Sequence, residues 1–396
     1  MSVTAIIFWT FLTIVFYTFL GYGMLLYVLV KIKRAFVKPK IYSDSLEYPD
    51  VTLFITAYNE EAVVDDKMLN CHLLDYPKDK LHIVWVTDGS DDATNEKLSK
   101  WNDVIVYYEP ERRGKMCAMN RGMKQVHTPL VIFTDANTTL NREAVKEIIN
   151  CFYDPKVGCV AGEKRIASTD RQSAAQGGEG VYWKYESALK ALDNQLYSTV
   201  GAAGELFALR RELYREIESD TLLDDFVLSL RIVMDGYKIA YCKNAYAMEG
   251  GSANISEEEK RKVRIAAGGL QSIGRLWMLL NPFKYGIFTF QYVSHRVLRW
   301  SVTPFLLFAL FPLNLALVIE CSFSSVLYNI IFVLQILFYI MGLVGNTFQQ
   351  RQLKSKIFFI PYYFLFMNIN VFKGIAYLSR YKGDGIWAKS SRHNIS

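Results

Sequence analysis

The spacing of apolar residues changes along the chain and divides it into parts. Residues 3–30 form a single uncharged run, longer than the roughly 20 residues that a membrane-spanning helix needs. Lys31, Lys33 and Arg34 follow the run, whereas the basic residues of a cleaved signal peptide precede its apolar part. Basic residues collect on the cytoplasmic side of membranes. The pattern therefore predicts an anchor over residues 1–34, with the chain that follows in the cytosol.

Short apolar runs replace the long one between residues 50 and 256, and stretches with helical spacing separate them. The runs predict four buried parallel strands, over residues 51–56, 81–87, 104–108 and 130–134. Stretches between them predict helices, among them residues 60–74 and 114–126. Alternation of strands and helices at this spacing is typical of an open α/β sheet with right-handed crossovers. In such sheets ligands bind beyond the carboxyl ends of the strands.

The chain becomes basic and then apolar again after residue 256. Residues 257–300 mix basic and aromatic side chains, which suits amphipathic helices at a membrane surface. Residues 301–378 form a second membrane region, in which 301–319 and 324–346 are long enough to span a bilayer. Its last part, residues 357–378, precedes a basic tail over residues 379–396. Moving these charges across a bilayer is costly, so we expect residues 357–378 to lie along the cytosolic face.

The composition agrees with one domain of ordinary size joined to membrane helices. Hydrophobic residues make up 51% of the chain and charged residues 21%, which is too apolar for an ordinary soluble enzyme and too charged for a membrane bundle. The basic clusters at the ends of the apolar runs favour contact with anionic membrane lipids. They lack the interleaved aromatics of a nucleic-acid site, so no nucleic-acid partner is expected. The six cysteines show no CxxC pair and no metal spacing, which indicates free thiols in a reducing compartment.

Polar clusters follow the first, second and fourth predicted strands, at residues 56–61, 87–92 and 134–138. An acidic residue at a strand end can receive a ribose hydroxyl or a base N–H. Asp135 and Asn137 can turn oxygens toward one hard divalent cation, which would neutralise a diphosphate leaving group. Each cluster alone is also a common turn or cap. Three in order at consecutive strand ends favour a ligand site.

These clusters resemble motifs of family 2 glycosyltransferases, in the membrane-bound branch that contains poly-N-acetylglucosamine, hyaluronan, chitin and cellulose synthases. The matching segments are Ala57–Glu61, the Asp-Gly-Ser turn at Asp88, Gly114–Gly122 and Asp135–Asn137, and the resemblance covers about residues 50–270. It implies a GT-A fold, Rossmann-like, flanked by transmembrane helices. It also implies inverting transfer from a UDP-sugar with Mg²⁺ or Mn²⁺, the metal bound by Asp135 and Asn137. The donor-binding residues it implies are Ala57, Tyr58, Glu60, Asp88, Lys115, Asp135 and Arg264.

Two downstream segments extend the resemblance. Leu223–Arg231 looks like the family's T-E-D-x-x-L-x-x-R segment, which would make Asp225 the general base with Asp224 beside it. The alternative for this acidic pair is a cap on a helix over Phe226–Met234. The small-residue loop Gly201–Arg211 resembles the family's acceptor loop, which implies acceptor contacts at Gly201 and Gly204. Glu205 departs from the apolar residue expected there.

The segment Arg261–Gly269 is similar to the family's Q-x-x-R-W signature. Arg264 falls at the arginine that meets the donor diphosphate. Arg261 replaces the glutamine, and Ile265 replaces the tryptophan on which processive synthases stack the acceptor sugar. A basic amphipathic helix at the membrane surface is the alternative interpretation of this segment. Because Ile265 has no aromatic face, we expect single transfers or short products.

Three functions remain open on the sequence. The leading one is transfer of a sugar to a glycan or lipid-linked acceptor by a multi-pass protein of the bacterial inner membrane, with its catalytic domain in the cytosol. The second is a processive polysaccharide synthase. The third is an inactive scaffold or export subunit, against which five separated polar residues argue: Asp88, Lys115, Asp135, Asp225 and Arg264.

Overall fold

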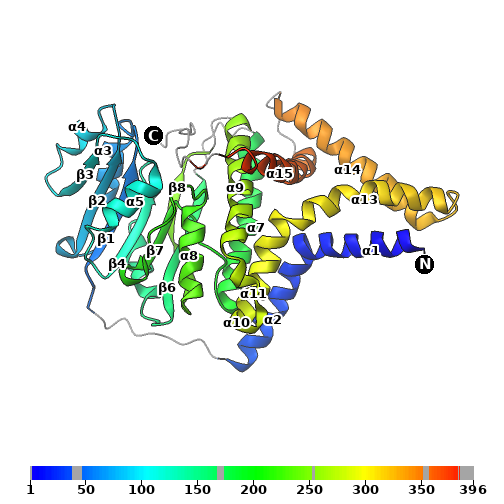
Figure 1. The fold of residues 1–396 in the computed structure, drawn as a ribbon, viewed down its shortest axis with the longest axis horizontal. Coiled ribbons are helices and arrows are strands. Elements are labelled where there is room, and N and C mark those ends of the chain that lie inside the picture. Colours follow the sequence, from blue (N-terminus) through cyan, green and yellow to red (C-terminus); the bar gives the residue numbers. More distant parts are fainter. Residues whose placement is uncertain are drawn as a thin grey trace.

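The computed structural model describes residues 2–37, 47–166, 174–251, 255–350, 356–381 and 383. An α/β body lies at one end of the molecule, and long apolar helices extend from the other (Figure 1). The strands of the body are β1 Val51–Ala57, β2 Leu81–Asp88, β3 Val104–Glu109, β4 Leu130–Asp135, β5 Thr139–Leu140, β6 Val157–Ile166, β7 Leu206–Arg210 and β8 Lys238–Glu249. The helices that cover the sheet are α3 Val64–His72, α4 Thr94–Leu98, α5 Lys115–Met123, α6 Ala144–Cys151, α7 Ala174–Leu196 and α8 Asp224–Met234.

The strands form one sheet in the order β3-β2-β1-β4-β7-β6-β8-β5. The four predicted strands are confirmed as parallel neighbours, and β7 runs antiparallel between β4 and β6. Thr56 pairs with Asp135 across β1 and β4, and Ala57 pairs with Thr87 across β1 and β2. The ends of β1, β2 and β4 therefore meet at one edge, as the polar clusters predicted.

Two apolar layers enclose the sheet, because its strands are buried on both faces. One layer packs α3 and α6 against it through side chains such as Met68 and Ile148. The other packs α5 and α8 against it through Met119 and Leu228. The α/β class predicted from the alternation of strands and helices is thus confirmed.

Three predicted helix boundaries were wrong. The helix predicted over residues 60–74 begins only at Val64, because Asn59 has a φ of 53° in the left-handed region and a turn follows it. The helix predicted over residues 114–126 is shorter and spans Lys115–Met123. It cannot include Gly114, because that residue has a φ of 92°. The helix predicted from Phe226 begins at Asp224, and Leu223 occupies the cap position. Asp224 and Asp225 therefore lie in the first turn of α8, and neither is its cap.

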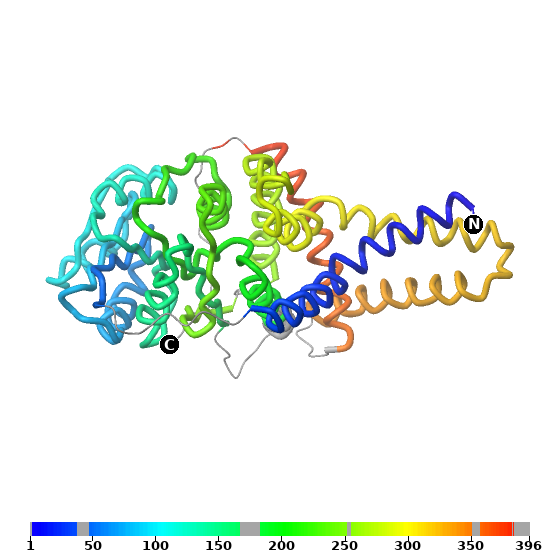
Figure 2. Tube along the Cα trace, turned by 90° about the horizontal axis from the view of Figure 1, so that it is seen from below, coloured from blue at the N-terminus to red at the C-terminus, as the bar shows by residue number. Residues whose placement is uncertain are grey.

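Four helices among the described residues are long and apolar enough to cross a membrane. The first comprises α1 Val3–Phe16, a π-helical turn at Tyr17–Gly21 and α2 Tyr22–Phe36. The others are α13 Val302–Glu320, α14 Val326–Gln350 and α15 Lys356–Leu378, of which the qualifying span is Ile357–Leu378. Helices α1, α13 and α14 project together from the body (Figure 2), and α1 packs on α13 through Phe8 and Leu310.

Helix α15 differs from the other three in its packing. It lies against α9 (Ile255–Arg275), so closely that a methyl group on Gly374 would be 2.7 Å from the Cβ atom of Ala266. Lys373 of α15 also forms an ion pair with Glu259 of α9. The expectation that residues 357–378 lie along the cytosolic face stays a prediction, and most of the basic tail is outside the described residues.

The segment between α9 and α13 is folded into the body. It comprises η4 Trp277–Leu280, α10 Pro282–Tyr285, α11 Ile287–Tyr292, the π-helical η5 Val293–Val297 and α12 Leu298–Trp300. Phe288, Tyr292 and His295 are buried, and the two aromatics belong to the core beneath α5 and α8. The sequence predicted amphipathic helices at the membrane surface here. Some aromatic side chains of this segment instead belong to the protein core.

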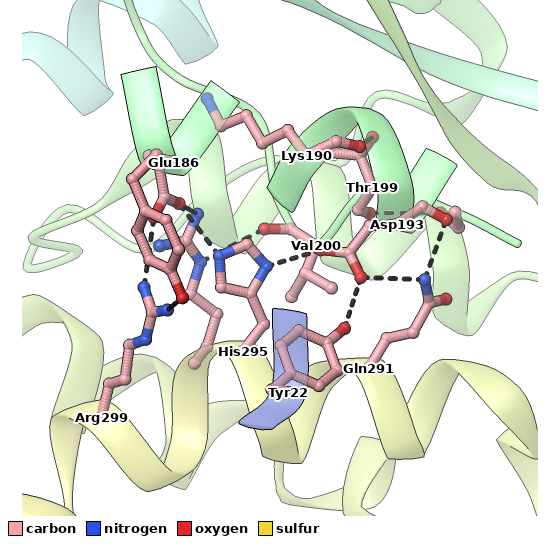
Figure 3. Close-up of polar contacts among 12 residues, drawn as sticks. Tyr22, Glu186, Lys190, Asp193, Thr199, Val200, Gln291, His295 and Arg299 are labelled. Carbon is pink, nitrogen blue, oxygen red and sulfur yellow. Dashed lines mark hydrogen bonds and ion pairs between the residues drawn. The ribbon is translucent and has the colours of Figure 1, made fainter. Parts of the chain in front are cut away.

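A buried polar network joins this segment to α7 (Figure 3). The Nδ1 atom of His295 lies 2.6 Å from an Asp193 carboxylate oxygen, and its Nε2 atom lies 3.1 Å from Glu186. Both carboxylates are buried. Each ring nitrogen of His295 thus faces a buried carboxylate, which can accept a hydrogen bond from it.

Further donors complete the network and tie it to the first membrane helix. The hydroxyl of Tyr22 in α2 donates to Asp193, and the Gln291 amide donates to the same oxygen over 3.0 Å. Burial by itself would raise the pKa of Glu186, but the charges of Arg296, His295 and Arg299 hold that pKa well below its usual range. The α2 helix is therefore attached to the α/β body through buried polar groups that must stay paired.

We predict that His295→Gln destabilises the protein by about 3 to 5 kcal/mol, because it removes the imidazole that bridges two buried carboxylates. His72→Gln is a matched control: His72 also lies 2.6 Å from an aspartate, Asp103, but these two side chains are 34% and 58% exposed. Its loss should be no more than about 1 kcal/mol. Urea unfolding of the full-length protein in detergent measures both. Equal losses in the two variants would contradict the prediction.

Candidate active site

The Lys115 ammonium lies at the centre of the polar edge of the sheet. Its Nζ atom is 3.3 Å from an Asp135 carboxylate oxygen and 3.3 Å from an Asp224 carboxylate oxygen. Asp135 ends β4, Asp224 begins α8, and Lys115 begins α5. Three elements far apart in sequence thus bring two predicted donor residues and one predicted catalytic residue together.

Gly204, a predicted acceptor residue, also lines this site. A methyl group there would lie 3.5 Å from the Asp225 Oδ2 atom and 3.8 Å from the Lys115 Nζ atom, so the glycine keeps the backbone close to both groups. The cleft has a cavity volume of only about 10 Å³ and is lined by Phe54, Thr56, Lys115, Met119, Phe133, Thr134, Asp135, Gly204, Phe207 and Asp224. Gly201 is explained by packing instead: its φ is 86°, and a methyl group would lie 2.3 Å from the Phe226 ring.

The charges in the cleft set two protonation states. Burial and the neighbouring Asp224 carboxylate raise the pKa of Asp225 to about 7, although the Lys115 charge opposes them. Burial lowers the pKa of Lys115, but the carboxylates of Asp135, Asp224 and Asp225 outweigh it and raise that pKa above its ordinary value. Lys115 is therefore a permanent cation, whereas Asp225 can exchange a proton near neutral pH.

Asp88 connects the end of β2 to the start of α5. Its Oδ2 atom accepts the backbone N–H groups of Arg113 at 3.0 Å and Gly114 at 2.7 Å. Gly89, with a φ of 68°, lets the two loops approach, since a methyl group there would be 2.6 Å from the Arg112 nitrogen. The Oδ1 atom is buried, accepts no hydrogen bond within the described residues and forms an ion pair with Arg121 over 3.6 Å. One carboxylate oxygen thus fixes the loop before Lys115, and the other keeps its acceptor capacity.

The cluster after β1 is bound to the cluster after β2. The Asn59 amide donates to Asp91 over 2.6 Å, and the Asp91 backbone N–H donates back to Asn59 over 3.1 Å. The Glu60 backbone N–H donates to Thr94 over 2.8 Å. Ala57 is a buried strand residue. These contacts give several residues of the A-Y-N-E-E segment a structural role in joining the two loops. Contacts of Ala57, Tyr58 and Glu60 with the donor stay predictions.

A buried lysine that the sequence analysis missed holds the loop of Asp135 and Asn137. Lys67 is 2% exposed, and its ammonium donates to the Thr138 carbonyl at 2.8 Å, to Thr134 Oγ1 at 3.1 Å and to Thr138 Oγ1 at 3.2 Å. Neither threonine is charged. The signal in the sequence was available: Val64, Lys67, Met68 and Cys71 follow the i, i+3, i+4, i+7 spacing of the buried face of a helix.

The residues predicted to hold a divalent cation fit that role together with a diphosphate. Asp135 is 30% exposed at the cleft and lies two residues before Asn137, in the turn between β4 and β5. Within the described ranges, no group of three or more His, Cys, Asp or Glu side chains could bind a metal by itself. Mg²⁺ is commonly bound by one or two protein carboxylates plus substrate phosphates. The metal ligands Asp135 and Asn137 stay a prediction.

Helix α9 presents its predicted residues on two faces. Gln271 accepts the Leu222 backbone N–H, and a methyl group on Gly268 would be 2.6 Å from Leu223. Arg264 lies one turn before Gly268 on the same face, toward the loop that leads into Asp224. Its contact with a donor diphosphate stays a prediction. Ile265 lies on the neighbouring face.

The family described as Glycosyltransferase like family 2 matches residues 49–268. This range contains the sheet, the cleft and helix α9 up to the close contact at Gly268. The chain belongs to this family. The family 2 glycosyltransferase and its GT-A fold, which the sequence motifs implied, are thereby confirmed.

The relatives with assigned activities are polysaccharide synthases. The chain is 30% identical over 242 residues to poly-β-1,6-N-acetyl-D-glucosamine synthase of Staphylococcus aureus, which covers 59% of this chain and 57% of the relative. It therefore spans a little more than half the length of these relatives. It is 24% identical over 396 residues to the synthase of the same name from Staphylococcus epidermidis, covering 94% and 95% of the two chains.

A solved structure resembles the whole molecule. A mannosyltransferase from Pyrobaculum calidifontis, in complex with GDP-Man and Mn²⁺, superimposes with a TM-score of 0.70 at 20% identity, covering 95% of this chain and 99% of that one. At this identity the match concerns the fold. The arrangement of a GT-A domain with flanking helices is shared along nearly the full length of both proteins.

We predict that Lys67 makes the stability of this glycosyltransferase depend on alkaline pH. Burial lowers the pKa of Lys67 from 10.5 to about 8. The unfolded chain therefore binds more protons between these values, and stability rises with pH across that window, by up to about 1.4 kcal/mol per pH unit. Lys67→Met removes this contribution, so the difference in unfolding free energy between wild type and variant should grow from pH 8 to pH 10.5.

Lys100→Met is the matched control, because Lys100 is 63% exposed in its pair with Glu96. Denaturant unfolding at a series of pH values compares the three proteins. A difference between wild type and Lys67→Met that stays constant with pH, like that of the control, would show that Lys67 is not held in a desolvated site.

Proposed function

We propose that this protein transfers a sugar from a UDP-sugar to a glycan or lipid-linked acceptor, with inversion and with Asp225 as the general base. The observation that carries the proposal is the position of Asp225: a carboxyl group with its pKa raised to about 7, whose Oδ2 atom would lie 3.5 Å from a methyl group on Gly204, a residue that lines the cleft. UDP-N-acetylglucosamine is the first donor to test, because the bacterial relatives are named for polymers of that sugar.

The chemistry is a single displacement. The acceptor hydroxyl oxygen forms a bond to the anomeric carbon as the bond from that carbon to the diphosphate oxygen breaks. The hydroxyl proton passes to the Asp225 carboxylate, and UDP leaves with its electron pair. A general base must be within hydrogen-bond reach of the hydroxyl, which suits a residue that faces Gly204 in the acceptor loop.

Charge neutralisation assists the leaving group. Lys115 is a cation at the cleft, and Arg264 lies on α9 one turn before Gly268, which is close to Leu223. Asp135 and Asn137 would hold Mg²⁺ or Mn²⁺, which neutralises diphosphate charge when bound. The Lys115 ammonium pairs with Asp135 and Asp224 in the absence of donor, so donor binding would exchange these partners for phosphate oxygens.

The nucleotide would bind along the ends of β1 and β2. The Oδ1 atom of Asp88, which accepts no hydrogen bond within the described residues and lies 3.6 Å from an Arg121 nitrogen, supports a hydrogen bond from a base N–H or a ribose hydroxyl. Tyr58 offers an aromatic ring nearby, which the Arg112 guanidinium covers at 3.7 Å from the ring centroid. Both features favour a planar, hydrogen-bonding group at this end of the cleft.

The location we propose is the bacterial inner membrane, with the catalytic domain in the cytosol. Four candidate spans support a multi-pass protein. Lys33 and Arg34 lie at the end of α2 next to the catalytic body, where Lys33 donates to the Gln195 and Leu196 carbonyls. Basic residues at this end favour the cytosolic side. The convergence of Lys115, Asp135 and Asp225 in one cleft argues against an inactive scaffold.

We predict that Asp225→Asn lowers the transfer rate about 10²- to 10⁴-fold, because the amide cannot accept the acceptor proton. UDP affinity should stay close to that of wild type, since the donor site is intact. Asp235→Asn, at the opposite end of α8 in a surface pair with Arg215, is the control and should keep its activity. The wild-type rate should fall below about pH 7, where protonated Asp225 is inactive. UDP release and product formation are measured, and near-normal turnover by Asp225→Asn would exclude it as the base.

Divalent cation and nucleotide should bind together. Because the protein offers Asp135 and the neutral Asn137, we predict poor metal affinity without UDP and weak UDP affinity after chelation. Asp135→Asn should reproduce the effect of chelation without adding to it. Isothermal calorimetry measures UDP affinity with Mn²⁺, with Mg²⁺ and with a chelator. Undiminished UDP binding in the chelated wild type would refute a metal bridge at Asp135.

A further inference from the structure

The helix that carries two acids of the cleft has no side-chain cap at its start. Helix α8 begins at Asp224, and Leu223 occupies the cap position, where its apolar side chain makes no hydrogen bond. A side-chain cap normally fixes the first turn of a helix by accepting from one of its free N–H groups. The positions of Asp224 and Asp225 therefore depend on how other elements hold the segment before them.

One side chain of α9 binds the backbone of that segment at two points. The Gln271 Oε1 atom accepts the Leu222 backbone N–H over 3.0 Å, and its Nε2 atom donates to the Asp220 carbonyl over 2.9 Å. A side-chain amide carries both a donor and an acceptor, so a single glutamine can satisfy two backbone groups that no helix or strand pairs. The backbone just before Asp224 is thus held through an N–H and through a carbonyl.

A second residue of the same helix face holds the side chains of the segment. The Arg275 guanidinium donates to the Thr221 hydroxyl and, over 2.6 Å, to an Asp220 carboxylate oxygen. Arg275 lies four residues after Gln271, so the two side chains leave α9 from one face. Backbone and side chains of the segment are therefore both bound to α9.

Close packing on several sides fixes the position of α9 itself. A methyl group on Gly268 would lie 2.6 Å from Leu223, and one on Gly269 would lie 2.4 Å from the Trp300 ring of α12. The candidate membrane helix α15 packs on α9 at Gly374, and α9 stands between the sheet and α15 (Figure 1). Densely packed elements have little freedom to shift. Helix α9 is therefore a rigid support for the segment that leads into Asp224.

We propose that Gln271 is a positioning residue for the general base: its two hydrogen bonds set where the first turn of α8 presents Asp225 to the cleft. The proposal rests on the proposed role of Asp225 in glycosyl transfer and adds a residue that acts through Asp225. Leu222 is three residues from Asp225, so a shift of the segment also shifts the carboxylate. A base must lie within hydrogen-bond reach of the acceptor hydroxyl, and a displacement of about 1 Å can cost roughly 100-fold in rate.

The first test removes the hydrogen bonds of Gln271 in two steps. Gln271→Glu can still accept the Leu222 N–H but cannot donate to the Asp220 carbonyl, and Gln271→Met can do neither. UDP release from UDP-N-acetylglucosamine is measured with the full-length proteins in detergent. We expect kcat to fall about 10- to 100-fold in Gln271→Met and by a smaller factor in Gln271→Glu, whereas UDP affinity, measured by calorimetry, should stay close to that of wild type. Lys260→Met is the matched control, because Lys260 is 70% exposed on the same helix, and it should keep the wild-type kcat.

A double variant separates positioning of the base from a general loss of structure. The base is already absent in Asp225→Asn, so adding Gln271→Met should lower the residual rate by less than about twofold, because losses that act through one group do not add. A general distortion of the cleft would multiply the two losses instead. Urea unfolding shows whether each variant is folded, and Gln271→Glu takes the place of Gln271→Met in the double variant if the latter is not.

The outcomes distinguish the positioning role from the proposed function. A wild-type kcat in Gln271→Met would overturn the positioning role, as would losses that multiply in the double variant or a parallel loss of UDP affinity. Near-normal turnover by Asp225→Asn would overturn the base and the positioning role together. No UDP release by wild type from any UDP-sugar would overturn glycosyl transfer itself.

Discussion

The active site depends on one ammonium group placed among carboxylates. Asp135, Asp224 and Asp225 converge on the cleft from β4 and α8, and like charges at such separations oppose one another. Lys115 neutralises part of this charge from distances of 3.3 Å. The amino end of α8 also favours the two acids in its first turn. The neutralisation is incomplete at Asp225, whose pKa is raised to about 7. The same balance thus assembles the site and raises the pKa of the residue that we propose as the base.

Other groups act by keeping these charges in position. Asp88 fixes the loop from which Lys115 projects, and the buried Lys67 fixes the loop that carries Asp135. Such buried charges are costly unless their hydrogen bonds are satisfied. The same requirement governs the attachment of α2, where His295 stands between Glu186 and Asp193. Catalytic body and membrane helix are therefore joined by groups that tolerate little displacement.

The structure shows the surroundings of two residues that depart from the family pattern. Glu205 replaces an apolar residue of the acceptor loop, and it pairs with Lys164 beside Trp183. Ile265 replaces an aromatic residue on α9, and Arg261 and Lys262 of the preceding turn lie near the same Trp183 ring.

The sequence by itself determined the sheet, its polar edge and the family. Buried strands appear as continuous apolar runs, and parallel strands must end at a common edge, so local pattern was sufficient for the sites of Asp88 and Asp135. Helix starts at Val64 and Asp224 were misplaced because they depend on backbone angles and loop contacts. Only the tertiary structure decided the partners of Lys67, Trp183 and His295. His295, for example, is 102 residues from Asp193, and a contact at such separation leaves no periodic signal along the chain, because packing of distant elements creates it.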